Sequence, residues 1–435
     1  MGFALLYEQL LADDPALDRP GGHVLACVLC GEKPDDELAL RCGSCDGAID
    51  AVHDMSRAHP VAGADPLESY FGLLPVRDRA HLTWLGEGDT PCFRSEGFGP
   101  LVGLSNLYLK NEAANPTLST KDRIASVGLS RFSELGVKRF VMASTGNSST
   151  AYARGVQAVG GMEMALFCGD RFLHRLNYPD HPSVRTYAVR GDFVSTGRVA
   201  RRFADRTGAL SEGGFFNLAR REGLKLAYLE AFDQMPRRPE YVFQAVSSGM
   251  GLVGAYKGAL EYRHLGRLED LPRFVAVQQS SCAPMAHAFA EGSPVIADRH
   301  IVRDPGGPAE AILRGDPTRT YPYVRQVCLD SGGRITAADN DDVREIRALL
   351  LRTEGLNVCH AAATALAAAV RMRHEGTLDP DSTVLVNLTG ADRTGRPAPT
   401  RYHRVDADWP DGPIDWDQDP DTEASKAKGD RTCAP

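Results

Sequence analysis

The sequence predicts an α/β protein with two lobes, in which parallel-rich sheets are flanked by helices, and a small cysteine module near the N-terminus. Three observations lead to this prediction. Apolar strands alternate with helix-period segments from residue 100 onward, which is typical of parallel sheets covered by helices on both faces. A chain of 435 residues with 43% apolar residues can bury a core large enough for two or more lobes. Four cysteines form two closely spaced pairs.

The two cysteine pairs each have the spacing C-x-x-C. Together they can present four thiolates tetrahedrally to Zn²⁺, and nearby glycines allow the tight turns that such a site needs. A site with four thiolates has no open coordination position, so a zinc ion here would be structural. The two pairs lie closer together than is usual for zinc, so a metal-free or redox-active set of thiols is the alternative. The four residues are Cys27, Cys30, Cys42 and Cys45.

Segments with the character of buried strands recur through the middle of the chain. Each is a short apolar run bounded by glycine, proline or polar residues. Residues 148–159, and those from 252 onward, have helical spacing instead. The predicted strands are KRFVMAS (138–144), MEMALFC (162–168), YVFQAV (241–246), FVAVQQ (274–279) and VLVNLT (384–389).

Polar turns follow three of these strands. STGNSS begins at Ser144, SSGMG begins at Ser247, and the turn TGADR begins at Thr389. In parallel sheets ligands gather at the carboxyl ends of the strands, so these turns are the candidate binding segments. Taken alone, each is more simply explained as an ordinary turn.

The SSGMG turn predicts a phosphate site. A glycine-bearing turn ahead of a helix exposes backbone N–H groups beside the positive end of the helix dipole. No Gly-Lys-Ser/Thr follows and the spacing is not G-x-G-x-x-G, so we expect a single phosphate and not a nucleotide. Lys121, a loop at STGNSS that suits a carboxylate, and the neutral hydroxyl of Thr389 complete the parts that a pyridoxal phosphate site needs.

From about Leu67 to Arg393 the chain resembles the fold type II (tryptophan synthase β-like) pyridoxal-phosphate enzymes, and among them the threonine synthase and cysteate synthase family. Eight segments that resemble the family's motifs occur in the family's order, which is far more specific than any one of them. They are LGEGDTP (85–91), NPTLSTKDR (115–123), ASTGNSS (143–149), NLARREGLKLAYLEAF (217–232), SSGMGLVGAYKG (247–258), VQQSSCAPM (277–285), TEGLNVCHAAA (353–363) and NLTG (387–390).

The resemblance implies a role for each candidate residue. Lys121 would form the Schiff base with pyridoxal 5'-phosphate and later shuttle the α-proton. Asn147 would bind the cofactor's 3'-oxygen, and Thr389 would face its pyridine nitrogen. The backbone of Ser247, Ser248, Gly249, Met250 and Gly251 would hold the cofactor phosphate, and Ser144, Thr145 and Ser148 would line the loop for the substrate carboxylate.

The hydroxyl at position 389 has a consequence for the reaction. A hydroxyl cannot keep the pyridine protonated as an aspartate can, which favours elimination and replacement chemistry. The expected activity is β- or γ-replacement or elimination on a small, O-phosphorylated amino acid, with O-phosphohomoserine and water giving threonine and phosphate as the leading case. The alternatives are a specialised synthase with cysteate-synthase-like β-replacement, a serine or threonine dehydratase, and a non-catalytic binding protein.

Two departures from the family pattern bear on the substrate more than on the chemistry. Gly-Ser-Phe commonly precedes the lysine, whereas residues 118–120 here are Leu-Ser-Thr. His-Gly and a lysine commonly follow the final Thr-Gly, whereas residues 391–393 here are Ala-Asp-Arg.

His360 is a candidate base, although a structural role is the simpler explanation for a single histidine. The candidates for a substrate anion site, with ordinary ion-paired charges as the alternative, are Arg123, Arg154, Lys225 and Arg393.

The expected domains are a zinc-ribbon-like module with the four cysteines (1–62), a large cofactor-binding domain (63–120 with 221–405) and a small domain with the carboxylate loop (121–220). The acidic, proline-rich residues 406–435 are expected to form a mostly disordered tail, with an active-site lid or dimer strap as the alternative.

The net charge of -8 argues against a nucleic-acid partner. No segment has the character of a signal peptide or membrane span, so a cytoplasmic enzyme without a membrane partner is expected. The family suggests a homodimer.

Overall fold

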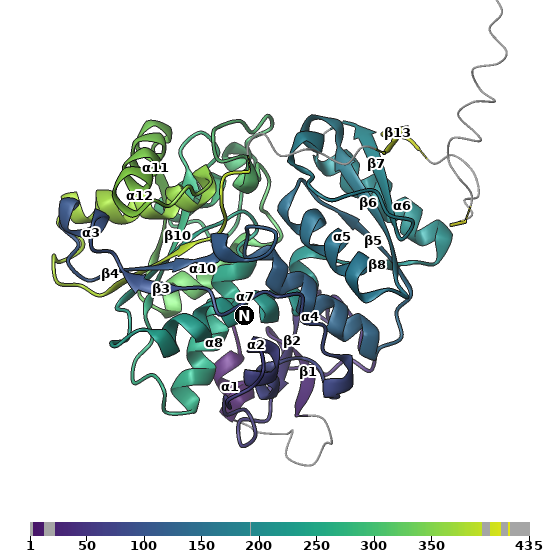
Figure 1. Cartoon of the computed structure of the whole chain (residues 1–435), viewed down its shortest axis with the longest axis horizontal. Helices are drawn as coiled ribbons and strands as arrows, with labels where there is room; N and C mark the ends of the chain where they lie inside the picture. The colour runs from purple at the N-terminus through teal and green to yellow at the C-terminus, as the bar shows by residue number, and fades with distance from the viewer. Residues whose placement is uncertain (1–2, 13–21, 192, 394–400, 410–415, 418–435) are drawn as a thin grey trace, which may run out of the picture. The chain divides into compact units, whose positions relative to one another are not determined.

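The computed structural model describes residues 3–12, 22–191, 193–393, 401–409 and 416–417. The chain divides into two compact units (Figure 1). Unit 1 consists of Met1–Leu135 and Phe215–Thr394, and unit 2 consists of Gly136–Gly214 and Gly395–Pro435. Each unit has its own sheet and its own helices, so the predicted α/β fold with parallel-rich sheets is confirmed. The domain limits expected from the sequence stay a prediction.

Unit 1 is built on a six-stranded sheet with the order β11-β10-β9-β12-β4-β3. Every neighbouring pair is parallel except β3 and β4, which are antiparallel. The strands are β3 (Cys92–Arg94), β4 (Leu107–Asn111), β9 (Tyr241–Ala245), β10 (Arg273–Gln279), β11 (Arg334–Ala338) and β12 (Val384–Leu388).

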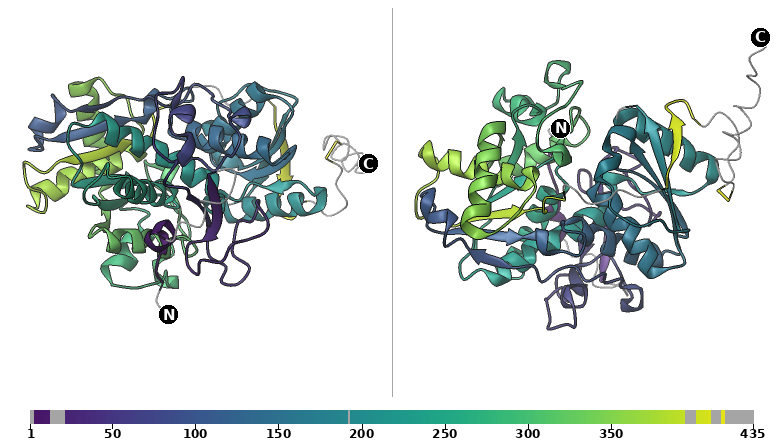
Figure 2. Two further views of the ribbon diagram at one scale, coloured as in Figure 1. Left: turned by 90° about the horizontal axis from the view of Figure 1, so that it is seen from below. Right: turned by 45° about the horizontal axis from the view of Figure 1, so that its top comes forward.

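Alternate residues of the central strands enter two different apolar cores. In β9, Val242 packs in the core that contains helices α7 and α8, whereas Tyr241 and Phe243 pack in the core that contains α11 and α12. Burial on both faces explains why these strands are continuous apolar runs in the sequence. Helices therefore cover both sides of the sheet (Figure 2). The helices of unit 1 are α1 (Tyr7–Ala12), α2 (Pro66–Ser69), α3 (Phe98–Leu101), α4 (Lys121–Glu134), α7 (Leu218–Gln234), α8 (Met250–His264), α9 (Pro284–Ala290), α10 (Tyr321–Asp330), α11 (Asn340–Glu354) and α12 (His360–His374).

Short 3₁₀ helices connect several of these elements. One of them, η3 (Glu112–Ala114), follows β4 directly and leads into the loop before α4. The others are η1 (Phe71–Leu73), η2 (Arg79–His81), η4 (Asp170–Arg175), η5 (Gly214–Phe216), η6 (Asp298–His300) and η7 (Glu310–Ile312).

The N-terminal module is a two-stranded antiparallel ribbon within unit 1. Strand β1 (His23–Cys27) pairs with β2 (Ile49–His53), and Cys27 lies opposite Ile49. The ribbon shares a small apolar core with Leu218, the first residue of α7. The module therefore packs directly on a helix of the larger sheet.

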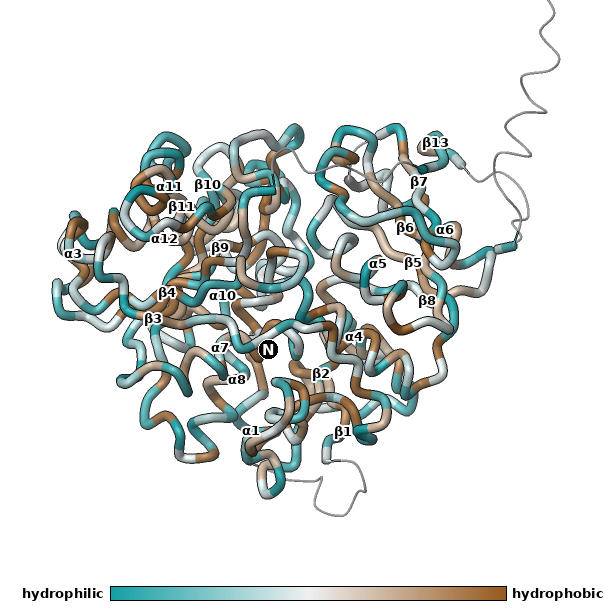
Figure 3. The backbone as a smooth tube through the Cα atoms, viewed as in Figure 1, coloured by the Kyte–Doolittle hydropathy of each residue, from teal (hydrophilic) through white to brown (hydrophobic). Residues whose placement is uncertain are grey.

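Unit 2 has a five-stranded sheet with the order β13-β7-β6-β5-β8, and all of its neighbouring pairs are parallel. Figure 3 shows hydrophobic residues along its central strands β5 and β6. Trp416 is buried in the core of this unit, while 410–415 and 418–435 of the expected tail lie outside the described residues. The elements are β5 (Arg139–Ala143), α5 (Asn147–Val159), β6 (Glu163–Gly169), β7 (Val184–Arg190), α6 (Phe193–Thr207), β8 (Leu210–Ser211) and β13 (His403–Asp406).

Candidate active site

Three candidate segments follow three neighbouring strands of the unit 1 sheet. Lys121 comes after β4 by way of η3, Thr389 comes directly after β12, and the turn at 247–251 comes after β9. Strands β4, β12 and β9 are adjacent and parallel. Because the carboxyl ends of parallel strands meet at one edge of a sheet, the structure brings these segments to the same edge.

The loop before Lys121 is hydrogen-bonded to the segment that follows β12. The N–H of Thr120 donates to the carbonyl oxygen of Thr389 at 3.0 Å, and Ser119 pairs with Gly390 in a short antiparallel bridge. A Cβ added to Gly390 would lie 3.1 Å from the Cβ of Ser119, so glycine is what permits this close approach. The backbones at Lys121 and Thr389 are therefore held beside each other, although the two residues are 268 positions apart along the chain.

Helix α4 starts at Lys121 and its first turn is fixed locally. The carboxylate of Asp122 accepts hydrogen bonds from the N–H of Thr117 at 2.6 Å and from its hydroxyl at 2.7 Å. Leu118 has φ of +62°, a left-handed conformation that favours glycine, at a position where the family pattern has glycine. Leu118 therefore strains the backbone of the turn before Lys121.

The electrostatic surroundings of Lys121 favour a neutral amine. Burial and then the guanidinium of Arg220 lower the pKa of Lys121 to about 8, and Glu112 opposes them with a smaller effect. Arg220 lies in the first turn of α7 and is itself buried. The sequence interpretation missed Arg220 because it stands in a charged run, and nothing in such a run distinguishes a buried arginine from a solvated one.

The turn after β9, residues 247–251, has the geometry of an anion-binding site, and we call it the cradle. Gly249 precedes the first residue of α8 and has φ of +87°. A Cβ at this position would lie only 2.1 Å from a methyl carbon of Val324 in helix α10, so any other residue would force Val324 to move. The first N–H groups of a helix have no partner within the helix and sit at its positive end. This turn therefore fits a phosphate dianion.

Polar side chains lie beneath these turns. Asn387 of β12 is buried, and its Oδ1 accepts no hydrogen bond within the described part of the chain. Tyr228 of α7 donates its hydroxyl to Oε1 of Gln244, and the amide carbon of Gln244 lies 3.5 Å from where a Cβ of Gly251 would be. The sequence interpretation named none of these three polar residues, because a lone polar residue in an apolar run gives no signal of its own.

Unit 2 carries the fourth predicted segment, the loop after β5. The hydroxyl of Ser144 accepts the N–H of Ser149 at 3.2 Å, and Gly146 has φ of +148°. Asn147 is the first residue of α5. Ser144 and Ser148 are buried, whereas Thr145 and Asn147 are half-buried. The loop thus has the turn and helix start expected of a carboxylate site within its own unit.

Two of the four residues predicted for an anion site form buried ion pairs instead. Arg123 is buried, and its guanidinium bonds Glu112 at 2.7 Å and Glu230 at 2.6 Å. Lys225 is also buried and ion-paired. Their role is structural, because both side chains are fully buried in unit 1 and already paired with carboxylates. Arg154 is exposed and Arg393 is half-buried.

His360, the predicted candidate base, begins helix α12 and is half-buried. Burial first, and then the nearby Arg347, lowers the pKa of His360 below its ordinary value. The imidazole is therefore neutral at neutral pH.

Lys225 belongs to a buried cluster of charges where β2 meets α7 and α8. The ammonium of Lys225 lies 2.5 Å from Glu222 and 2.8 Å from Glu261. His53 is close enough to both carboxylates for the three to bind a metal ion, but the cluster has equal numbers of acids and bases without one. The acids are Asp50, Glu222 and Glu261, and the bases are Arg221, Lys225 and Lys257.

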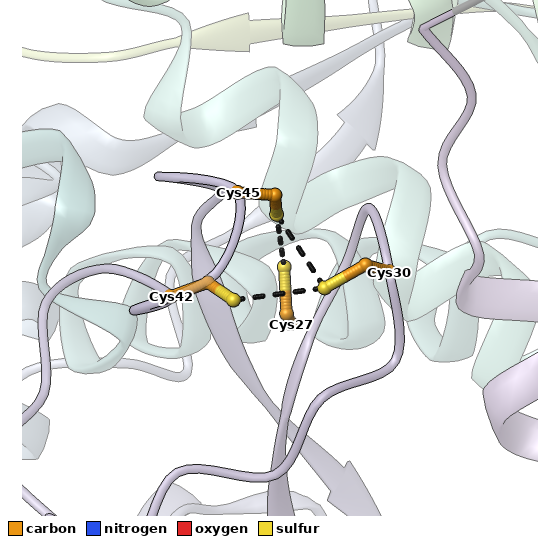
Figure 4. Close-up of side chains that lie close together, drawn as sticks. All are labelled: Cys27, Cys30, Cys42 and Cys45. Carbon is orange, nitrogen blue, oxygen red and sulfur yellow. Dashed lines mark hydrogen bonds between the residues drawn. The ribbon is translucent and has the colours of Figure 1, made fainter. Parts of the chain in front are cut away.

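The four cysteines of the N-terminal module converge on one point (Figure 4). Their sulfur atoms are 3.4 Å apart for Cys27 and Cys45, 3.4 Å for Cys45 and Cys30, and 3.6 Å for Cys30 and Cys42. All four are free thiols. Tetrahedral zinc with bonds of about 2.3 Å would place its sulfur ligands slightly less than about 4 Å apart, so this donor set fits zinc.

Comparison with known proteins gives a consistent family. Residues 83–390 match the family model described as pyridoxal-phosphate dependent enzyme. The chain is 28% identical to a threonine synthase of Methanocaldococcus jannaschii over 388 residues, which cover 84% of this chain and 91% of that protein. It is equally, 28%, identical to a cysteate synthase of Methanosarcina barkeri over 388 residues, which cover 85% of this chain and 92% of that protein.

Solved structures agree with the fold. A maize serine racemase superposes with a TM-score of 0.57 at 18% identity, over 71% of this chain and 91% of that one. A processed threonine deaminase isoform 2 from Solanum lycopersicum gives a TM-score of 0.59 at 15% identity, over 78% of this chain and 95% of that one. Among the described residues, no helix has the length and apolar character that crossing a membrane requires.

Proposed function

The chain belongs to the pyridoxal-phosphate dependent enzyme family, and on that premise we propose that it catalyses elimination or replacement on a small O-phosphorylated amino acid. The leading specific reaction is that of a threonine synthase, in which O-phosphohomoserine and water give threonine and phosphate. The observation that carries the proposal is the meeting of Lys121, Thr389 and the Gly249 turn at one sheet edge. A lysine, a neutral hydroxyl and an anion cradle are what this chemistry needs.

The residues of unit 1 fit the cofactor. Bound pyridoxal phosphate supplies an electron sink for the α-carbon of an amino acid. The N–H groups at the start of α8 would hold its phosphate, since the left-handed Gly249 leads the chain directly into the first turn of that helix. Thr389, directly after β12, would face the ring nitrogen.

Lys121 is the group that would hold and move a proton. With a pKa of about 8, about a tenth of its amine is neutral at pH 7 and about half at pH 8, so it can accept and return a proton in that range. Burial first, and then Arg220, keeps this pKa low, and Arg220 adds positive charge near the amine. That charge suits a substrate phosphate or carboxylate, so we assign Arg220 to substrate binding.

The family resemblance assigns the remaining groups to the loop after β5 and the start of α5. Asn147 is proposed to hydrogen bond the 3'-oxygen of the cofactor, and the loop of Ser144, Thr145 and Ser148 to receive the substrate carboxylate. The support is the match to the family motif together with the turn after β5 and the start of α5.

A cysteate-synthase-like β-replacement on O-phosphoserine is the second candidate. Relatives of both kinds are equally similar to this chain. The departures at residues 118–120 and 391–393 flank Lys121 and Thr389, where they would affect the substrate first. Asp392 is bonded to Arg347, and its N–H donates to the carbonyl oxygen of Asn357 at 3.0 Å, so the second segment is rigidly held.

A substrate panel tests the proposal. The protein, saturated with pyridoxal phosphate, is given O-phosphohomoserine or O-phosphoserine with water, sulfite or sulfide, and phosphate release and product masses are measured. Phosphate release from O-phosphohomoserine with threonine as product supports the leading reaction, and cysteate from O-phosphoserine and sulfite supports the second. Keto acid and ammonia from unphosphorylated serine or threonine, without phosphate release from either ester, would overturn both in favour of a dehydratase.

We also propose that the four cysteines bind one structural zinc ion, which metal analysis of the purified protein tests.

A further inference from the structure

The second cysteine pair is joined to helix α10 by a buried hydrogen bond. A Cβ on Gly47 would lie 2.7 Å from Sγ of Cys27 and 3.1 Å from Sγ of Cys45, so this residue is packed among the cysteine sulfurs. The next residue, Ala48, is buried and donates its N–H to the hydroxyl of Tyr323 at 2.8 Å. Tyr323 thus contacts the chain immediately beside the predicted metal ligands.

Helix α10 also touches the predicted phosphate cradle. Val324, the residue after Tyr323, is buried, and one of its methyl carbons lies 2.1 Å from where a Cβ of Gly249 would be. Two successive residues of one helix therefore contact the cysteine module and the cradle. Since a helical turn is rigid, a shift of Tyr323 moves Val324 with it.

A second connection runs from the module to α7. The guanidinium of Arg221 donates to the carbonyl oxygen of Ile49 at 2.5 Å and to the carboxylate of Asp50 at 3.1 Å. Arg221 follows Arg220, the cation beside Lys121. The module therefore holds both the helix that supports the cradle and the helix that carries the cation near the reactive amine.

We propose that Tyr323 is a positioning residue through which the metal-loaded cysteine module holds the cofactor-phosphate cradle in shape, so that metal and cofactor bind cooperatively. The inference rests on the proposed cofactor site. Without metal, the four thiols no longer share a common partner, and residues 42–48 gain freedom. Ala48 then fixes Tyr323 less firmly, and one wall of the cradle is less well defined. Because binding linkage is reciprocal, the cofactor strengthens metal binding by the same factor.

The first test compares two tyrosine variants in the full, zinc-loaded chain. Tyr323→Phe removes only the hydroxyl that meets Ala48, and it should weaken pyridoxal phosphate binding about five-fold or more in a spectroscopic titration. Tyr262→Phe is the matched control, because it removes a buried hydroxyl that donates to Asp233 at 2.7 Å, elsewhere in unit 1. The control should lower the melting temperature without changing cofactor affinity. Unchanged affinity in Tyr323→Phe, or an equal loss in both variants, overturns the inference.

The second test uses the wild-type protein alone and does not depend on the folding of a variant. Hydrogen exchange is followed by mass spectrometry with and without pyridoxal phosphate. Peptides covering 42–48 and 321–328 should exchange more slowly with cofactor, while those covering α11 should not change. No added protection at 42–48 overturns the inference. If the wild type binds no pyridoxal phosphate in the titration, the proposed function itself fails, and the two failures are thereby distinguished.

Discussion

The N–H of Thr120 donates to the carbonyl oxygen of Thr389 at 3.0 Å. This hydrogen bond ties the residue before Lys121 to the end of the strand β12. The backbones that carry the predicted amine and the predicted hydroxyl are therefore fixed to each other. Changes at either residue should act on the chemistry before they act on the fold.

Replacing Lys121 with alanine should abolish cofactor capture. The wild-type protein with pyridoxal phosphate should show a visible absorption band that persists through gel filtration, and Lys121→Ala should lack it, because no other amine lies at this sheet edge among the residues named for the site. Lys138→Ala is the control, since Lys138 is exposed and lies in unit 2. A retained band in Lys121→Ala would exclude this lysine as the attachment point.

Cofactor capture should depend on pH through Lys121. Only the neutral amine can react, so the rate of capture should rise with pH through a midpoint at about 8 and level off well above it. Arg220→Gln removes a cation that lowers this pKa, so the midpoint of the profile should move to higher pH, while Arg220→Lys keeps the charge and should keep the midpoint. Stopped-flow absorbance gives the profile. An unchanged midpoint in Arg220→Gln would mean that burial alone sets the pKa of Lys121.

Much of this site could be predicted from the sequence, for a physical reason. Buried parallel strands are apolar runs, and the polar turns at their ends differ clearly from them, so the pattern predicts the turns at Ser247 and Thr389. The strand order could not be predicted, because β4 (Leu107–Asn111) contains Lys110 and was not recognised as buried. Lys110 is tolerated there because it pairs with Glu230 at 2.8 Å, a contact between residues 120 positions apart.

The charged residues illustrate the same difficulty. Arg123 and Arg220 stand in charged runs, whereas Lys225 stands between two leucines. For Arg123 and Lys225 the sequence offers an anion site and an ordinary ion pair as equal explanations. Burial decides between them, and burial depends on which helices pack together. Only Arg220, which the sequence interpretation did not name, lies near Lys121 with its charge acting on the amine.

Gly249→Ala should weaken both stability and cofactor binding. The substitution forces a left-handed residue, at a cost of about 1 to 2 kcal/mol, and drives its Cβ into Val324. Gly266→Ala is the matched control, because Gly266 has φ of +70° and a Cβ there would meet nothing within 4 Å. Denaturant unfolding should show a larger loss for Gly249→Ala, and only this variant should bind pyridoxal phosphate more weakly. Equal effects of the two substitutions on cofactor binding would argue against the cradle.

The buried charge cluster gives the last prediction, on stability. Lys257 is buried and pairs with Glu222, and Lys257→Met would leave the cluster with one more acid than base. Breaking a buried pair in this way typically costs about 3 to 5 kcal/mol, because a charge is left uncompensated in a low-dielectric interior. Arg263→Met is the comparison, since Arg263 forms an exposed pair with Glu8 and such pairs are worth about 1 kcal/mol or less. Urea unfolding measures both variants. A similar small loss for the two would show that water or a proton compensates Glu222, and the cluster would then not be the rigid junction between the N-terminal module and helices α7 and α8 that the geometry indicates.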